Sequence, residues 1–204
     1  MPKTFCYHGC MTKINVYDEW SRDKLLHEYK ELLKRKKFGI VWENKPEDVA
    51  EQCKTLLPVL REQKDKDISS EKNGVTHIII EGDNYHALSV LNYTHRHKID
   101  VIYIDPPYNT GARDWKYNND YVDKNDMYRH SKWLSFMNKR LRLAKRLLTH
   151  DGVLVCTVDE NEFTKLGLLL EEIFPSHQIT CITIVHNPAG IQGDNFSYCH
   201  EYAY

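Results

Sequence analysis

The chain has 204 residues, of which 41% are hydrophobic and 28% are charged, and this balance excludes a disordered or fibrous protein. The formal net charge is −1, so a polyanionic partner has to be held by local clusters of Lys and Arg and not by a global positive field. The longest apolar stretches, such as Val153–Val158, are far shorter than a bilayer requires, and the amino terminus has no apolar signal core, so we expect a cytoplasmic protein.

The six cysteines are scattered along the chain. We expect no disulfides, because three of them lie in or beside apolar, strand-like segments, where free thiols behave as small hydrophobes. Cys6, His8 and Cys10 are metal-ligating residue types, but a zinc site needs a second ligand pair at a matching spacing. The sequence therefore predicts no metal site.

The first 74 residues form a helical amino-terminal extension and a linker. Apolar residues recur at three- and four-residue steps over 18–37 and predict an amphipathic helix, and a second helix is expected over 46–56. The basic run Lys34–Lys37 complements a helix dipole, and contact with DNA phosphate is the alternative. The charged, Ser- and Gly-containing stretch 61–74 indicates a linker, so we divide the chain into domains 1–74 and 75–204.

Beyond the linker, apolar strands alternate with amphipathic helices, which is the pattern of an α/β fold. The longest helix carries a stripe of apolar residues flanked by Lys and Arg, and Gly152 marks the end of that helical stretch. The expected strands are 76–81, 99–104, 153–158, 179–185 and 201–204, and the expected helices are 84–91, 126–148 and 161–174.

The strand 99–104 delivers Asp105-Pro106-Pro107-Tyr108 at its carboxyl end, the edge of an open parallel sheet where ligands bind. Two consecutive prolines fix two φ angles and remove two amide donors, so the loop is rigid and its carbonyl oxygens are free to face a ligand. This set suits an exocyclic amine. Asp105 and the Pro106 carbonyl can accept its two hydrogens, and Tyr108 can stack on the base plane.

Two structural alternatives remain open for these residues. The Asp-Pro-Pro-Tyr sequence can simply end a strand, because X-Pro commonly interrupts regular structure. Asp83, in Glu81-Gly82-Asp83-Asn84, can bond a nucleoside amine or hydroxyl from the same sheet edge, or can cap the helix that follows. The two roles of Asp83 are compatible with each other.

Several longer motifs carry a family resemblance over nearly the whole chain. They are Phe38–Glu43, Ile80–Leu88, Asp100–Gly111, Trp133–Met137, Arg140-Leu141, Gly152-Val153, Asp159–Glu162, Glu171–Phe174, Asn187-Pro188 and His200–Tyr202. Together they resemble the site-specific adenine-N6 DNA methyltransferases of the beta arrangement, and in particular the modification subunits of Type III restriction-modification systems.

The resemblance implies a partial Rossmann-like, S-adenosylmethionine-dependent methyltransferase sheet in residues 75–204, the catalytic half of the domain. It implies that Asp105, Pro106, Pro107 and Tyr108 form the target-adenine site, and that Asp83, with Asp105, lies at the cofactor. The implied partners are double-stranded DNA, a restriction subunit and a second methyltransferase subunit.

The sequence departs from the family pattern at two points. The Phe-x-Gly-x-Gly cofactor loop and the target-recognition region do not occur in residues 1–204, so we expect a truncated chain that is inactive alone, or one that a complementary chain completes. Ala189 stands where the resemblance leads us to expect Arg, as in many relatives, and this departure puts one DNA contact in question. A cytosine-N4 methyltransferase and a non-catalytic fragment of a decayed or split gene are the alternative functions.

Overall fold

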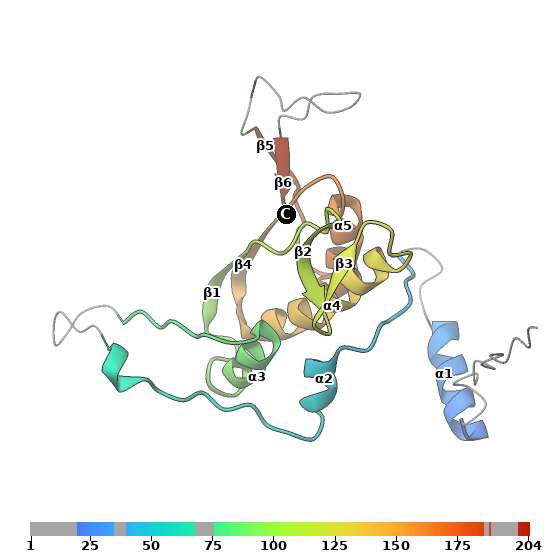
Figure 1. The fold of residues 1–204 in the computed structure, drawn as a ribbon, viewed down its shortest axis with the longest axis horizontal. Coiled ribbons are helices and arrows are strands. Elements are labelled where there is room, and N and C mark those ends of the chain that lie inside the picture. Colours follow the sequence, from blue (N-terminus) through green and yellow to red (C-terminus); the bar gives the residue numbers. More distant parts are fainter. Residues whose placement is uncertain (1–19, 35–39, 68–75, 186–187, 189–199) are drawn as a thin grey trace, which may run out of the picture. The chain divides into compact units, whose positions relative to one another are not determined.

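The computed structural model describes residues 20–34, 40–67, 76–185, 188 and 200–204, and its contacts divide the chain into two compact units, Met1–Gly39 and Ile40–Tyr204. In the first unit the described residues form helix α1, Arg22–Lys34 (Figure 1). This confirms the described part of the helix predicted over 18–37. Two of its apolar side chains, Leu25 and Tyr29, are 42% and 58% exposed.

The second unit contains every other helix and strand of the described chain. In chain order these are α2 (Asp48–Gln52), a 3-10 turn (Lys64–Lys66), α3 (Asn84–Thr94), β1 (Ile99–Ile104), β2 (Ala112–Tyr117), β3 (Asp120–Asp123), α4 (Arg129–Leu147), β4 (Leu148–Val158), α5 (Phe163–Ile173), β5 (Ile182–Val185) and β6 (His200–Ala203). The mixture confirms the α/β prediction.

Four strands form a mixed sheet in the order β1-β4-β6-β5. The pair β1 and β4 is parallel, with Ile104 opposite Cys156, whereas β6 runs antiparallel to both β4 and β5. Parallel neighbours need a crossover connection, and here the hairpin β2–β3 and helix α4 supply it. The register brings the ends of β1, β4 and β6 together, because Thr157 of β4 also lies opposite Ala203.

Helices α4 and α5 supply most of the hydrophobic core. The apolar stripe predicted on α4 is buried as expected, and Met137 and Leu141 are 2% and 1% exposed. On α5, Leu166 and Leu169 have no exposed surface, and they belong to the same cluster as Val158 of β4. The core thus lies against the strands that deliver the polar loop of the sequence analysis.

The strand predicted over Thr76–Glu81 is wrong for this structure. The segment has no ladder partner within the described residues, and Ile78 and Ile79 are 70% and 96% exposed. Its apolar pattern indicated burial, but a strand forms only where a neighbour accepts and donates its backbone hydrogen bonds. Strand β1 is apolar on both faces yet buries only one, since Val101 and Tyr103 are 63% and 66% exposed.

The hairpin β2–β3 was not predicted, although the sequence contains its turn signal. Asn118 and Asn119 both adopt positive φ, at 51° and 68°, which is the backbone of the two-residue turn that suits a twisted hairpin. Two other boundaries moved. Strand β4 begins at Leu148, five residues before the expected strand, and α2 occupies Asp48–Gln52 within the expected 46–56. The predicted domain boundary near residue 74 lies outside the described residues.

In the part of the chain that the structure describes, no helix is both long and apolar enough to cross a membrane.

Two adjacent leucines of α5 test this account of the core. Leu169 is fully buried and Leu168 is 41% exposed. We expect Leu169→Ala to lower the free energy of unfolding by about 2–5 kcal/mol, because it leaves a cavity as well as losing apolar contacts. Leu168→Ala should cost less than about 1 kcal/mol. Urea denaturation followed by circular dichroism gives both values, and equal losses would contradict the packing described here.

Candidate functional site

The loop that follows β1 opens onto solvent at the sheet edge. Asp105, Pro106, Tyr108, Thr110 and Glu201 line an open cavity of about 470 Å³ there. The first four residues follow the carboxyl end of β1, and Glu201 comes from β6, nearly 100 positions later in the sequence. The structure therefore brings together three of the predicted site residues, Asp105, Pro106 and Tyr108, and adds an acid that the sequence analysis did not assign.

Asp105 is exposed to this cavity and is also bonded to a residue of β4. The Thr157 hydroxyl donates to Asp105 Oδ1 at 2.5 Å. This bond fixes the carboxylate while leaving it accessible to a ligand. In the sequence, Thr157 is distinguished only as a hydroxyl residue near the end of an otherwise apolar strand.

Pro107 has a different environment from Pro106. Its carbonyl oxygen accepts a hydrogen bond of 2.6 Å from the indole nitrogen of Trp133, a fully buried residue of α4. That carbonyl therefore anchors the loop to the core, whereas Pro106 lines the cavity. Pro107 thus holds the loop on the core, and Pro106 faces the open cavity.

Asn109 fixes the far end of the loop. It is fully buried with a φ of 60°, a left-handed conformation that Asn tolerates. Its amide nitrogen donates to Glu162 Oε1 at 2.5 Å, and its carbonyl oxygen accepts from the indole of Trp115 at 3.1 Å. Both polar ends of the side chain are therefore satisfied by neighbours on other elements.

Glu162, at the start of α5, is the residue on which the contacts of Asn109 depend. Its side chain has no exposed surface, and a buried carboxylate is tolerated only with charge and hydrogen-bond partners. Besides Asn109, it contacts the ring of His130 and lies 3.3 Å from Lys165 Nζ. The familial motifs of the sequence include Asn109, Trp133, Glu162 and Glu201, but no role was expected for these four residues.

Tyr108 points its hydroxyl at β6. The hydroxyl donates to Glu201 Oε2 at 3.4 Å, and the neighbouring Tyr202 stacks on Phe163 of α5 with ring centroids 4.2 Å apart, which fixes β6 at this edge. Burial raises the pKa of the Tyr108 phenol to about 12, and the negative charges of Asp105 and Glu201 act in the same direction. The phenol is therefore neutral and a donor at physiological pH.

Asp83 takes the capping role that the sequence left open. Its Oδ1 accepts from the Tyr85 amide at 2.7 Å at the start of α3. The same residue lines a second cavity of about 450 Å³, whose walls are mostly apolar and include Leu56, Pro58 and Val90. Gly82, with a φ of 149°, leaves open space where a Cβ would lie. An acid acceptor beside apolar walls fits the nucleoside part of the implied cofactor.

Among the described residues no three or more His, Cys, Asp and Glu side chains gather as metal ligands, and Cys53, Cys156 and Cys181 are free thiols. Cys6, His8 and Cys10 lie outside the described residues, as do Asn187 and Ala189.

Comparison with known proteins identifies the class. A family model described as DNA methylase, of the N6- and N4-methyltransferases, matches residues 99–204, which include β1, the loop and Glu201. The chain belongs to this family.

The relatives of this chain include subunits of Type III restriction-modification enzymes. The chain is 30% identical over 200 residues to the EcoPI Mod subunit of a Type III restriction-modification enzyme from Escherichia phage P1, which covers 84% of the chain and 30% of the relative. It is 29% identical over 195 residues to the EcoP15I Mod subunit of Escherichia coli, covering 83% and 30%. A Type II methyltransferase, M.KpnI of Klebsiella pneumoniae, is 33% identical over 124 residues, covering 59% and 30%. The chain thus spans about 30% of the length of these relatives.

The Tyr108 environment gives a pH prediction. A phenol whose pKa is higher in the folded than in the unfolded state adds stability that is complete below about pH 10 and is lost as the pH rises towards about 12. We expect Tyr108→Phe to make this alkaline loss of stability shallower, as measured by urea denaturation at a series of pH values. Tyr93→Phe, which removes a phenol that is 75% exposed, is the control. An unchanged pH dependence in Tyr108→Phe would contradict the buried position of this phenol.

Proposed function

We propose that the second unit of this chain carries the methyl-acceptor site of a DNA adenine-N6 methyltransferase that uses S-adenosylmethionine. The observation that carries the proposal is the accessible Asp105 carboxylate, held by Thr157 beside Pro106 and Tyr108 around one open cavity. The family membership supports methyl transfer to an exocyclic amine of DNA, and the Mod subunits among the relatives favour adenine.

The chemistry follows from the acceptors in the loop. Asp105 and the Pro106 carbonyl accept the two hydrogens of the amine, which directs its lone pair away from the loop and stabilises the positive charge that develops on nitrogen. The neutral Tyr108 ring stacks on the base. S-adenosylmethionine, when bound, supplies the electrophilic methyl group. Because Pro107 and Asn109 are anchored in the core, the acceptors are set before the base arrives.

The target amine is stacked inside duplex DNA, so the adenine has to be flipped out to reach the open cavity. The proposed partners are therefore double-stranded DNA in the cytoplasm and, by analogy with the Type III relatives, a restriction subunit and a second methyltransferase subunit. Asp83 and Asp105 would serve the cofactor side. Residues 1–204 contain no Phe-x-Gly-x-Gly loop, so we expect weak cofactor binding and no activity by the isolated chain, and a complementary chain with that loop would complete the site.

Asp105→Ala tests the catalytic proposal in a protein that joins this chain to a segment bearing the glycine loop. We expect methyl incorporation into DNA from tritiated S-adenosylmethionine to be lost, and the thermal melt to be retained, because an exposed loop carboxylate serves the site and not the core. Asp151→Ala, at an acid whose side chain is 95% exposed, is the control. Retained methyl transfer in Asp105→Ala would exclude its role.

Analysis of the methylated nucleosides in the same assay separates the alternatives. N6-methyl-2′-deoxyadenosine supports the proposal, and N4-methyl-2′-deoxycytidine would identify the cytosine-specific enzyme that the same family includes. A completed protein that binds DNA but transfers no methyl group would favour the decayed fragment.

Two substitutions of Tyr108 test the stacking role. We expect Tyr108→Phe to keep most activity, since the ring face carries the contact with the base. Tyr108→Ala should lose on the order of ten- to a hundred-fold in the step linked to flipping, because base stacking on an aromatic ring is worth roughly 1–3 kcal/mol. Fluorescence of 2-aminopurine at the target position reports the extruded base. Equal damage from both substitutions would instead make the hydroxyl contact with Glu201 the important one.

A further inference from the structure

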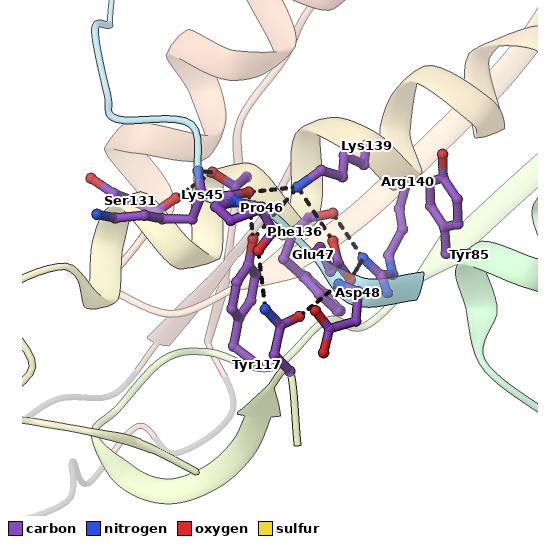
Figure 2. Close-up of polar contacts among 12 residues, drawn as sticks. Lys45, Pro46, Glu47, Asp48, Tyr85, Tyr117, Ser131, Phe136, Lys139 and Arg140 are labelled. Carbon is purple, nitrogen blue, oxygen red and sulfur yellow. Dashed lines mark hydrogen bonds and ion pairs between the residues drawn. The ribbon is translucent and has the colours of Figure 1, made fainter. Parts of the chain in front are cut away.

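A polar network joins the segment Lys45–Asp48 to helix α4 (Figure 2). The Lys45 amide donates to Ser135 Oγ at 2.9 Å, and its carbonyl oxygen accepts from the Tyr117 hydroxyl at 2.8 Å and from Lys139 Nζ at 3.0 Å. These bonds span 70 or more positions of sequence and use both backbone groups of Lys45. The segment is therefore fixed on α4 before α2 begins.

Glu47, the first acid of this segment, is only 4% exposed. Its carboxylate contacts Arg140 Nη1 at 2.7 Å and lies 3.5 Å from Lys139 Nζ. A carboxylate removed from water to this degree requires such partners, and removal of one partner is costly. Glu47 therefore determines where the guanidinium of Arg140 lies.

Arg140 is held on three sides. Its side chain is 10% exposed, its guanidinium lies 3.7 Å from the centroid of the Phe136 ring, and Nη1 also donates to the Phe136 carbonyl at 3.2 Å. The second nitrogen of the fork, Nη2, lies 3.4 Å from Asp83 Oδ1. Because a guanidinium is planar and rigid, fixing one nitrogen also fixes the direction of the other.

Asp83 lies where this chain of contacts meets the 450 Å³ cavity. Its Oδ1 receives both the Tyr85 amide, at 2.7 Å, and Arg140 Nη2. A helix cap needs only the first of these two donors. The second donor pins the carboxylate in one rotamer and leaves Oδ2 as the acceptor for a ligand. The Arg140 side chain is 10% exposed and the Asp83 side chain is 38% exposed, which agrees with a buried arginine that holds an accessible carboxylate.

We propose that Arg140 is a positioning residue of the nucleoside cavity: set by Glu47 and the Phe136 ring, it orients the Asp83 carboxylate that accepts a hydrogen bond from the adenosine part of the cofactor. The proposal rests on the proposed function. It gives the segment before residue 75 a role in the ligand site, since Glu47 acts through Arg140 on a residue of α3.

The test uses the 204-residue chain labelled with nitrogen-15, and two readouts by nuclear magnetic resonance. The first needs no ligand and is the hydrogen-exchange rate of the Tyr85 amide, which donates to Asp83. We expect Arg140→Met to accelerate it roughly three- to ten-fold, the equivalent of part of a helix cap. The exchange rate in Arg140→Lys should lie between those of the unsubstituted chain and Arg140→Met, because lysine keeps the charge but lacks the forked guanidinium. The control is Arg142→Met, two residues further along α4, where the arginine forms a half-exposed ion pair with Glu172.

The second readout is titration with adenosine at millimolar concentration, followed at the amides of residues 83–85. We expect Arg140→Met and Glu47→Gln to weaken this binding roughly five- to ten-fold, as expected for one misaligned charge-assisted hydrogen bond. In an Asp83→Asn background, the Arg140→Lys substitution should have little further effect on adenosine affinity, because Arg140 acts through the Asp83 carboxylate. A general packing role would instead weaken binding equally in both backgrounds.

The outcomes are distinguishable. If Tyr85 exchange and adenosine affinity in Arg140→Lys match those of Arg142→Met, the positioning role is wrong. Equal effects of Arg140→Lys with and without Asp83 would also overturn it. If the unsubstituted chain shows no adenosine shifts at residues 83–85 while its Tyr85 exchange responds to Arg140, the contact stands but the nucleoside site fails, and with it the cofactor part of the proposed function.

Discussion

The candidate site depends on a buried negative charge. Glu162 is removed from solvent at the start of α5, where it holds the side chain of Asn109 and is compensated by Lys165 and the ring of His130. Asn109 adopts a left-handed backbone in the loop after β1, and the Tyr108 hydroxyl just before it donates to Glu201 of β6. Removing the carboxylate would leave the buried Asn109 amide without its acceptor, and this cost favours one conformation of the loop.

The other contacts of the loop separate the groups held by the core from the groups that face the cavity. Trp133 takes the Pro107 carbonyl and Thr157 takes one oxygen of Asp105, so the core reaches the loop from α4 and from β4. Pro106 and the remaining acceptor capacity of Asp105 face the cavity. Preorganised acceptors of this kind need no rearrangement when charge develops on a substrate, and this is the property that the proposed methyl-acceptor role would use.

The sequence predicted much of this arrangement because the relevant signals are local. The apolar stripe of α4, the strand before Asp105 and the rigid Pro-Pro pair are each readable within a few residues. Thr157 and Glu201 could not be placed in this way, since the pairing of β1 with β4 brings Thr157 to the loop and the pairing of β4 with β6 brings Glu201 there. The link from Glu47 through Arg140 to Asp83 joins positions 36 and more residues apart, and a lone acid before a short helix gives no sign of it. The residues 76–81 show the converse, an apolar pattern whose strand needs a neighbour that the described residues do not provide.

The open side of β1 has a practical consequence for this 204-residue polypeptide. In the described part of the chain β1 pairs only with β4, so its other edge presents free backbone donors and acceptors next to exposed Val101 and Tyr103. Such an edge is a template for strand addition. A preparation of the isolated chain would therefore tend to self-associate through its sheet, and its solubility would report directly whether that edge has found a partner strand.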